Sequence, residues 1–157
     1  MTARDIVYGK LDERDIAQTK AMIEAYLRWI GIDLGFQDIE DELAHFPEKY
    51  KEPEGAFFVA RDGDEVVGCV GMKPLGDGAC EMKRLYVGDD HKGLGIGKRL
   101  VEIILAEAKA KGYTRMRLDT LRRMERALGL YRAFGFREIG QYVENPIEDA
   151  VFMERPL

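Results

Sequence analysis

The sequence has few cysteines and histidines, no long hydrophobic run and no excess of positive charge. No apolar stretch reaches the roughly 18 residues of a membrane-spanning helix, and the N-terminal segment MTARDIVYGK lacks the apolar core of a signal peptide. We therefore expect a soluble, cytoplasmic protein that has no membrane partner. Cys69 and Cys80 fit no metal-ligand spacing, and His45 and His91 stand in no cluster of ligands, so no metal is expected. The formal net charge of −5 argues against nucleic-acid binding, because domains that bind nucleic acids usually carry a basic stripe.

What is present is the composition of one compact globular domain, which we expect to span residues 1–157. The chain has 157 residues, of which 46% are hydrophobic and 34% charged, a globular rather than a disordered balance. Hydrophobic periodicity and turn residues predict strands and helices that alternate along the chain. The predicted strands are 6–11, 56–61, 65–73, 81–87, 115–120, 136–143 and 150–154, and the predicted helices are 15–30, 38–46, 98–111 and 124–134. This order predicts a mixed α/β sheet with helices on both faces, in which the strands before and after helix 98–111 run parallel.

Residues 81–99, EMKRLYVGDDHKGLGIGKR, contain three glycines between a predicted strand and a predicted helix. Gly93, Gly95 and Gly97 can adopt backbone angles that other residues avoid, and they have no Cβ to keep a ligand away. The helix that follows directs its free N–H groups and the positive end of its dipole at this point. A pyrophosphate is the natural ligand of such a loop.

Two common phosphate-binding motifs do not fit these glycines. A P-loop, G-x-x-x-x-G-K-[ST], would have Lys92 in place of its first glycine and Arg99 in place of its hydroxyl residue. A dinucleotide fingerprint, G-x-G-x-x-G, would find an acidic residue at Asp119 for the ribose, but Lys98 takes the position of its last glycine. A polar stretch also separates the strand from the glycines, so the dinucleotide motif is disfavoured.

Lys92-x-x-Gly95-x-Gly97 resembles the [QR]-x-x-G-x-[GA] loop of the GCN5-related N-acetyltransferase (GNAT) family, whose backbone amides hold the pyrophosphate of coenzyme A. Residues 127–136, ALGLYRAFGF, resemble the second motif of the family, A-x-x-L-Y-x-x-x-G-F, and the similarity extends over nearly the whole chain. Lys92 departs from the usual Arg or Gln but keeps a positive charge, and Met124 stands where many members have an Asn. The resemblance implies the GNAT fold, a mixed sheet that is splayed at its centre.

The resemblance also implies a set of catalytic residues. Glu81 matches the general base of the family, acting directly or through a water, although it could be only a polar residue at the start of a strand. Tyr131 matches the acid that protonates the departing thiolate, although it could be only a core aromatic. Leu85 matches the backbone donor to the acetyl carbonyl. The residues implied to bind acetyl-CoA, the cosubstrate, are Leu85, Tyr86, Val87, Lys92, Gly93, Leu94, Gly95, Ile96, Gly97 and Lys98.

The acceptor is the least specified part of this prediction. The first two helices and the tail wall the acceptor side in the family, which makes candidates of Tyr26, Trp29, Phe36, Phe46, Tyr142, Asn145 and Phe152, although aromatics in such positions are more often core residues. The acidic run 38–42 could attract a cationic amine or could simply be the solvated face of a helix. We expect acetyl transfer to the primary amine of a small or amino-acid-like molecule by direct attack in a ternary complex. The alternatives are a protein lysine or N-terminal acetyltransferase and a non-catalytic acyl-CoA-binding module, and a homodimer is possible.

Overall fold

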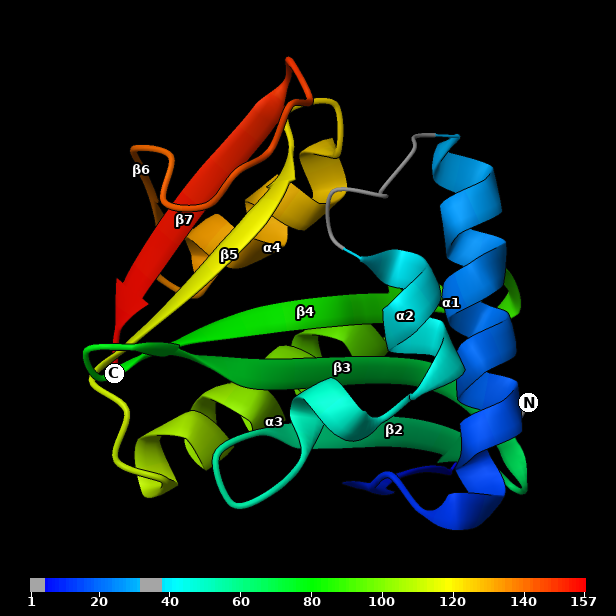
Figure 1. The fold of residues 1–157 in the computed structure, drawn as a ribbon. Helices are drawn as coiled ribbons and strands as arrows, with labels where there is room; N and C mark the ends of the chain where they lie inside the picture. Colours follow the sequence, from blue (N-terminus) through cyan, green and yellow to red (C-terminus); the bar gives the residue numbers. More distant parts are fainter. Residues whose placement is uncertain (1–4, 32–37) are drawn as a thin grey trace.

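The computed structural model describes residues 5–31 and 38–157, which form a seven-stranded sheet with helices on both faces (Figure 1). The strands are β1 (Ile6–Lys10), β2 (Ala56–Asp62), β3 (Glu65–Gly76), β4 (Ala79–Val87), β5 (Arg115–Leu121), β6 (Arg137–Ile139) and β7 (Ala150–Pro156). The helices are α1 (Ile16–Ile30), α2 (Ile39–Ala44), α3 (Ile96–Ala110) and α4 (Glu125–Ala133), with 3₁₀ turns at Glu13–Asp15, Glu48–Tyr50 and Asp89–His91. Helices α1 and α2 cover one face of the sheet and α3 and α4 the other (Figure 1), as the sequence predicts.

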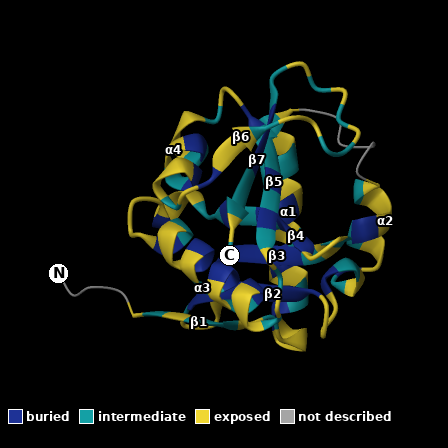
Figure 2. Cartoon of the chain, turned by 90° about the vertical axis from the view of Figure 1, so that its left-hand side faces the viewer, coloured by how far each residue is buried: buried dark blue, intermediate teal, exposed yellow. Residues whose placement is uncertain are grey.

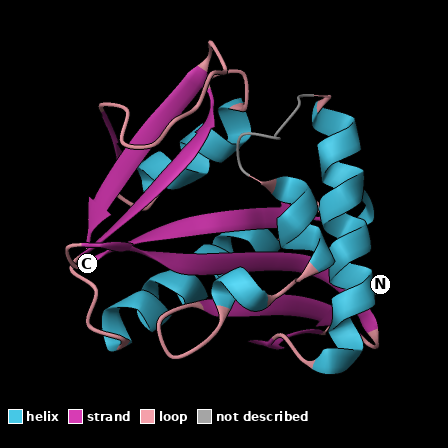
Figure 3. Cartoon of the chain, viewed as in Figure 1, coloured by secondary structure: helices cyan, strands magenta, loops and turns pink. Residues whose placement is uncertain are grey.

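The sheet opens between β4 and β5. Its strand order is β1-β2-β3-β4-β5-β7-β6, and β4 with β5 is its parallel pair, as expected for the strands on either side of α3. Their pairing covers only Ala79–Glu81 against Arg115–Arg117, although β4 continues to Val87 and β5 to Leu121. Beyond the paired residues the two strands diverge (Figure 3). The centrally splayed sheet that the family resemblance implies is therefore confirmed.

A bulge at Arg84 interrupts the alternation of side chains along β4. The φ angle of Arg84 is 59°, in the left-handed region, and the register between β3 and β4 shifts beside it. Met82 and Leu85 both pack against the hydrophobic core under α3, although in a regular strand two residues three positions apart would face opposite sides. Lys83 and Arg84 instead both make their ion pairs on the opposite face, Arg84 with Glu42 of α2. An inserted residue has this effect, because it puts two consecutive side chains on one side of the strand.

Two hydrophobic clusters hold the helices to the sheet. The larger lies between the sheet and helices α3 and α4 and includes Leu100, Ile104 and Leu128. The smaller lies on the other face, where Ile23 of α1 packs with an aromatic group centred on Phe57. Helical residues accordingly change from buried to exposed around each helix (Figure 2). Because apolar side chains are buried on both faces, the helices hold the two halves of the splayed sheet in place.

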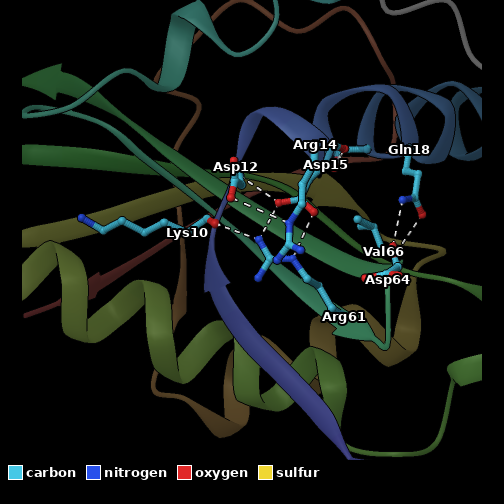
Figure 4. A network of polar contacts seen from close by, with 9 residues as sticks. Lys10, Asp12, Arg14, Asp15, Gln18, Arg61, Asp64 and Val66 are labelled. Atoms are coloured by element: carbon cyan, nitrogen blue, oxygen red, sulfur yellow. Dashed lines mark hydrogen bonds and ion pairs between the residues drawn. The ribbon is translucent and has the colours of Figure 1, made fainter.

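The start of α1 is tied to the β2–β3 hairpin by polar contacts (Figure 4). Arg61 Nε donates to Asp15 Oδ1 at 3.0 Å, and Arg61 Nη2 donates to the Lys10 carbonyl at 3.1 Å. The hydrogen bond from Arg61 lowers the pKa of Asp15. One turn later, Gln18 Oε1 accepts the Val66 N–H at 2.9 Å. These contacts anchor the N-terminal end of the helix whose other end reaches the cavity described below.

The strand predicted at 136–143 is shorter than expected, because only Arg137–Ile139 pair with β7. Residues 140–149 have no regular secondary structure. Within them, Tyr142 and Asn145 turn their side chains toward the sheet and bond to carboxylates there. Contacts of these side chains with distant strands therefore take the place of the strand pairing that the sequence pattern predicts for residues 140–143. In the described part of the chain, no helix is long and apolar enough to cross a membrane.

Candidate active site

A cavity of about 830 Å³ opens where β4 and β5 diverge, a size that suits a small-molecule site. Its walls come from both strands, from the glycine loop and the start of α3, from α4 and the turn before it, and from the end of α1. Asn145 and Ile147 of the 140–149 segment complete the wall. The splay therefore creates the cavity, since the space lies between strands that are neighbours in the sheet.

Two of the three loop glycines need the conformational freedom of glycine. The φ angles of Gly93 and Gly95 are 84° and 78°, and a Cβ added to either would meet no atom within 4 Å. Gly97 is different, because it lies in the first turn of α3 without a positive φ, and its Cβ would lie at ordinary contact distance, 3.7 Å, from Val87 Cγ2. Gly95 is the N-cap of α3, so the free N–H groups of the first helical turn begin at the wall of the cavity. This is the geometry that binds an anion.

The side chain of Lys92 is engaged at the rim of this loop. Its Nζ lies 2.9 Å from Asp89 Oδ1 and 5.6 Å from the centre of the Trp29 ring. Trp29 lies near the end of α1, lines the cavity and is 65% exposed. All of the predicted acetyl-CoA-binding residues line the cavity except Leu94, which is 54% exposed.

Tyr131 of α4 lies in the cavity wall and is buried. Its ring packs edge-on against Phe136 at a centroid distance of 5.9 Å. Burial raises the pKa of the Tyr131 hydroxyl, and the nearby phenols of Tyr26 and Tyr86 and the charge of Asp119 raise it further. The hydroxyl therefore keeps its proton at neutral pH. Tyr131 thus packs in the core and also borders the cavity, and its role as the acid stays a prediction.

Glu81 of β4 is buried but is not part of the cavity wall. Its Oε2 accepts a hydrogen bond from the Tyr142 hydroxyl at 2.5 Å, and its Oε1 lies 3.7 Å from Lys73 Nζ and 3.8 Å from Lys83 Nζ. Burial, followed by the charge of Glu81, raises the pKa of Tyr142. Leu85, four residues further along the strand, does line the cavity. The expected base and the expected carbonyl donor thus lie on the same strand, but only the donor borders the cavity directly.

Asp119 of β5 lies in the cavity wall, although its place in the sequence suggested only the ribose contact of a dinucleotide motif. Its side chain is 7% exposed. Asn145 Nδ2 donates to Asp119 Oδ2 at 3.1 Å, and Lys83 Nζ lies 3.6 Å from Asp119 Oδ1. The sequence offered one signal for this residue, an acidic side chain near the end of a strand parallel to the glycine strand.

The other acceptor candidates fall into distinct places. Tyr26 lines the cavity and stacks on Tyr86, with ring centroids 3.8 Å apart. Tyr142 lies behind the wall, and its ring meets Phe152 edge-on. Phe46 belongs to the core on the α1 face, and Phe36 lies outside the described residues. The acidic run 38–42 is not part of the wall, and its Glu42 is buried against Arg84.

His91 has acidic neighbours that the sequence spacing did not indicate. Its Nε2 lies 3.1 Å from Asp62 Oδ2, and possible ligand atoms of His91, Asp62 and Glu65 all lie within 4.8 Å of one another. The expectation that His91 stands apart from other potential ligands is therefore wrong. The three residues come together because the β2–β3 hairpin folds back beside the turn that follows β4, which is a tertiary contact.

Comparison with known proteins yields a consistent set of matches. Residues 21–136 match the family described as "Acetyltransferase (GNAT) family". The chain is 42% identical over 142 residues to "Uncharacterized N-acetyltransferase C1271.07c" of Schizosaccharomyces pombe. The aligned region covers 89% of this chain and 87% of that protein. A GNAT-family acetyltransferase structure from Staphylococcus aureus Mu50 superposes with a TM-score of 0.82 at 22% identity, over 97% of this chain and 99% of that one. The structure of PaiA N-acetyltransferase from Thermoplasma acidophilum in complex with coenzyme A superposes with a TM-score of 0.76 at 21% identity, over 98% and 99% of the two chains.

Proposed function

Since the chain belongs to the GNAT acetyltransferase family, we propose that it transfers the acetyl group of acetyl-CoA to the primary amine of a small or amino-acid-like acceptor. The proposed reaction is direct attack of the amine on the thioester while both substrates are bound. The main observation in support is the cavity itself. It adjoins the glycine N-cap of α3, lies between the diverging strands and is bordered by Tyr131, so one space adjoins an anion site and the residue proposed as the acid.

The glycine loop suits the pyrophosphate of acetyl-CoA. The positive φ angles of Gly93 and Gly95 leave open space where a side chain would otherwise stand, and the N-terminal end of α3 favours negative charge there. The coenzyme A in the PaiA structure supports this choice of ligand by analogy of fold. Backbone N–H groups of β4 that β5 leaves unpaired, that of Leu85 among them, would bond the acetyl carbonyl and stabilise the charge that develops on its oxygen.

The proton transfers assign roles to two side chains. Tyr131 would protonate the departing thiolate, a role that its raised pKa favours because the hydroxyl stays protonated. Glu81 remains the base proposed from the sequence, and because it lies behind the cavity wall it would act through a water. The C–N bond forms, the C–S bond of the resulting tetrahedral intermediate then breaks, and the neutral amine loses one proton for each acetyl group transferred.

The experiment that tests this function combines acetyl-CoA calorimetry with a screen of amines read by release of free thiol. Cys69 and Cys80 are buried, so the native protein contributes little thiol to the readout. The variant Gly95→Val should lower acetyl-CoA affinity by more than about 100-fold, because it strains the backbone at a φ of 78° and fills the space of the pyrophosphate. Gly112→Val is the matched control, since Gly112 has a φ of 92° and equally open surroundings beyond the far end of α3.

Both glycine variants should lose stability to a similar extent, about 1–3 kcal/mol from backbone strain. Only Gly95→Val should lose acetyl-CoA binding. Unchanged acetyl-CoA affinity in folded Gly95→Val would disprove the pyrophosphate assignment. Binding of acetyl-CoA without transfer to any amine or lysine peptide would favour the acyl-CoA-binding module, and transfer to peptides alone would favour the protein acetyltransferase.

A further inference from the structure

We propose that the carboxylate of Asp119 binds the amino group of the acceptor, and that the acceptor is a primary amine bound as its ammonium ion. This inference rests on the proposed function and specifies the substrate class of the same cavity. In this inference Asp119 takes the role of proton acceptor that the family resemblance implies for Glu81.

The first argument is the place of Asp119 in the splay. The last β5 residue paired with β4 is Arg117, so Asp119 lies two positions beyond the point where the strands separate. Side chains alternate along β5, and Met116 and Leu118 face the core under α3 and α4. Asp119 therefore comes from the other face of the sheet, whereas the glycine loop and Tyr131 come from the α3 and α4 side. An acceptor and acetyl-CoA that enter from opposite faces would meet between the strands.

The second argument is the incomplete bonding of the Asp119 carboxylate. Oδ2 accepts a hydrogen bond of 3.1 Å from Asn145, which fixes its orientation. Within residues 5–31 and 38–157, the only partner of Oδ1 is Lys83 Nζ, which at 3.6 Å lies beyond hydrogen-bond distance. A carboxylate that is nine-tenths buried normally makes several short hydrogen bonds. An ammonium group, with three donors, would supply the missing bond to Oδ1.

The third argument is the balance of charge at this position. Lys83 Nζ lies 3.8 Å from Glu81 and 3.6 Å from Asp119, so one ammonium is shared by two buried carboxylates. Glu81 has further partners in Tyr142 and Lys73, and it is screened from the cavity. Asp119 has no second cation in the described structure and borders the cavity. The site is thus able to take one more positive charge, and a bound ammonium ion supplies it.

The chemistry balances with this assignment. One proton of the bound ammonium passes to the Asp119 carboxylate, which frees the nitrogen lone pair to attack the thioester carbonyl. The C–N bond forms and the C–S bond breaks. The second proton leaves the nitrogen of the tetrahedral intermediate and replaces the one that Tyr131 gives to the thiolate sulfur. The proton on Asp119 returns to solvent when the products leave. Glu81 is then a positioning residue, which holds Lys83 beside Asp119.

The test compares two amines of similar shape, benzylamine, which is protonated at neutral pH, and aniline, which is not. In Asp119→Asn, kcat/KM for benzylamine should fall by roughly 100-fold, as for loss of a buried charged partner. The same parameter for aniline should change by less than about fivefold, because aniline brings no ammonium. Asp119→Glu, which keeps the charge, should recover part of the benzylamine activity. Acetyl-CoA affinity, measured on each preparation, should stay unchanged and shows that the variants are folded.

Two further variants serve as comparators. Glu81→Gln should lower kcat/KM for benzylamine by less than Asp119→Asn does and should change aniline by less than about fivefold, since it acts on Asp119 only through Lys83. Asp64→Asn, the same chemical change in the exposed β2–β3 turn, should leave both amines unaffected. Equal losses for benzylamine and aniline in Asp119→Asn, or a selective loss of benzylamine in Glu81→Gln alone, would overturn the assignment. Wild-type protein that acetylates aniline but not benzylamine, propylamine or spermidine would overturn it too, while leaving the proposed function intact. Failure to bind acetyl-CoA would instead refute the proposed function.

Discussion

Lys83 and Arg84 are adjacent residues on β4 that face the same side of the sheet, but their surroundings differ in kind. Arg84 is held by Glu42 of α2 through two hydrogen bonds of 2.9 Å, and Glu42 accepts a third, of 2.8 Å, from the Tyr50 hydroxyl. Among the described residues, the ion-pair partners of Lys83 are more distant, at 3.6 and 3.8 Å. Both residues line the cavity, but Arg84 is bonded at ideal distances whereas Lys83 is loosely held.

The difference shows how the strand serves two purposes at once. Arg84 adopts a left-handed φ, which costs energy for a residue with a side chain, and its buried ion pair stabilises this conformation. The bulge in turn keeps the Leu85 side chain facing the core under α3. Close pairing would make Lys83 equally rigid and would leave no partner capacity for a substrate. We infer that the Arg84–Glu42 ion pair maintains the shape of the splay. Lys83, with the carboxylates of Glu81 and Asp119, is available for binding.

The largest expected effect is on stability, in Glu42→Gln. Both side chains of the pair are almost fully buried, so the change leaves the Arg84 charge without a counter-ion and should lower the free energy of unfolding by about 3–5 kcal/mol. Urea unfolding measures it. Glu48→Gln is the matched control, because Glu48 forms an exposed ion pair with Lys51 at 3.8 Å and should change stability by less than about 0.5 kcal/mol. Equal losses of stability in the two variants would show that the buried Glu42–Arg84 pair stabilises the fold no more than an exposed ion pair does.

The pH dependence of the Glu42 effect has a defined sign. Burial alone would raise the pKa of Glu42, but the hydrogen bonds and charge of Arg84 and the Tyr50 hydroxyl outweigh it and lower the pKa below the usual 4.5. A group with a lowered folded pKa stabilises the protein above its unfolded pKa and loses this contribution as pH falls through the folded value. The gap between wild type and Glu42→Gln should therefore be constant near neutral pH and shrink below about pH 4.5. A gap that grows in acid would contradict this account of the pair.

The next largest effect is on turnover, in Tyr131→Phe. This variant tests whether a side chain that lines the cavity can be changed without lowering the stability of the fold. The ring and its contact with Phe136 remain, so acetyl-CoA affinity and stability should hold, while kcat should fall by about one to two orders of magnitude for loss of the general acid. Tyr113→Phe is the control, since the Tyr113 hydroxyl bonds the Glu54 carbonyl at 2.6 Å and lies outside the cavity wall. Full turnover in Tyr131→Phe would mean that Tyr131 only packs.

The smallest expected effect is the reactivity of the two thiols. Burial raises the pKa of both Cys69 and Cys80 to about 12, so iodoacetamide should label neither in the native protein at pH 8. Cys69 Sγ donates to the Arg84 carbonyl at 3.2 Å and thus reports on the bulge. In Glu42→Gln we expect Cys69 to be labelled faster than Cys80, as read by peptide mass spectrometry. Labelling of both at the same rate would show that the bulge opens only when the whole molecule unfolds.

The sequence alone determined the family, the order of strands and helices, and the glycine loop at the cavity. These features depend on local patterns, namely alternation, turn residues and two short motifs, and each is encoded within a few neighbouring residues. Gly95 at the N-cap of α3 and Tyr131 at the cavity wall lie where those motifs indicate. The prediction of a strand over 136–143 was too long, because the conformation of its second half depends on distant residues rather than on the local pattern. Tyr142 and Asn145 in and after it bond to carboxylates on other strands.

Only the tertiary structure decided which carboxylate borders the cavity. Glu81 and Asp119 are 38 positions apart (119 − 81) and both are acidic residues on strands, so nothing local distinguishes them. The splay separates them, because β4 and β5 are still paired at Glu81 and have parted by Asp119. The bulge at Arg84, held by Glu42 from a different part of the chain, belongs to the same class of features. Such features arise from long-range pairing and buried charge, whose energies depend on neighbours that the chain brings together only when it folds.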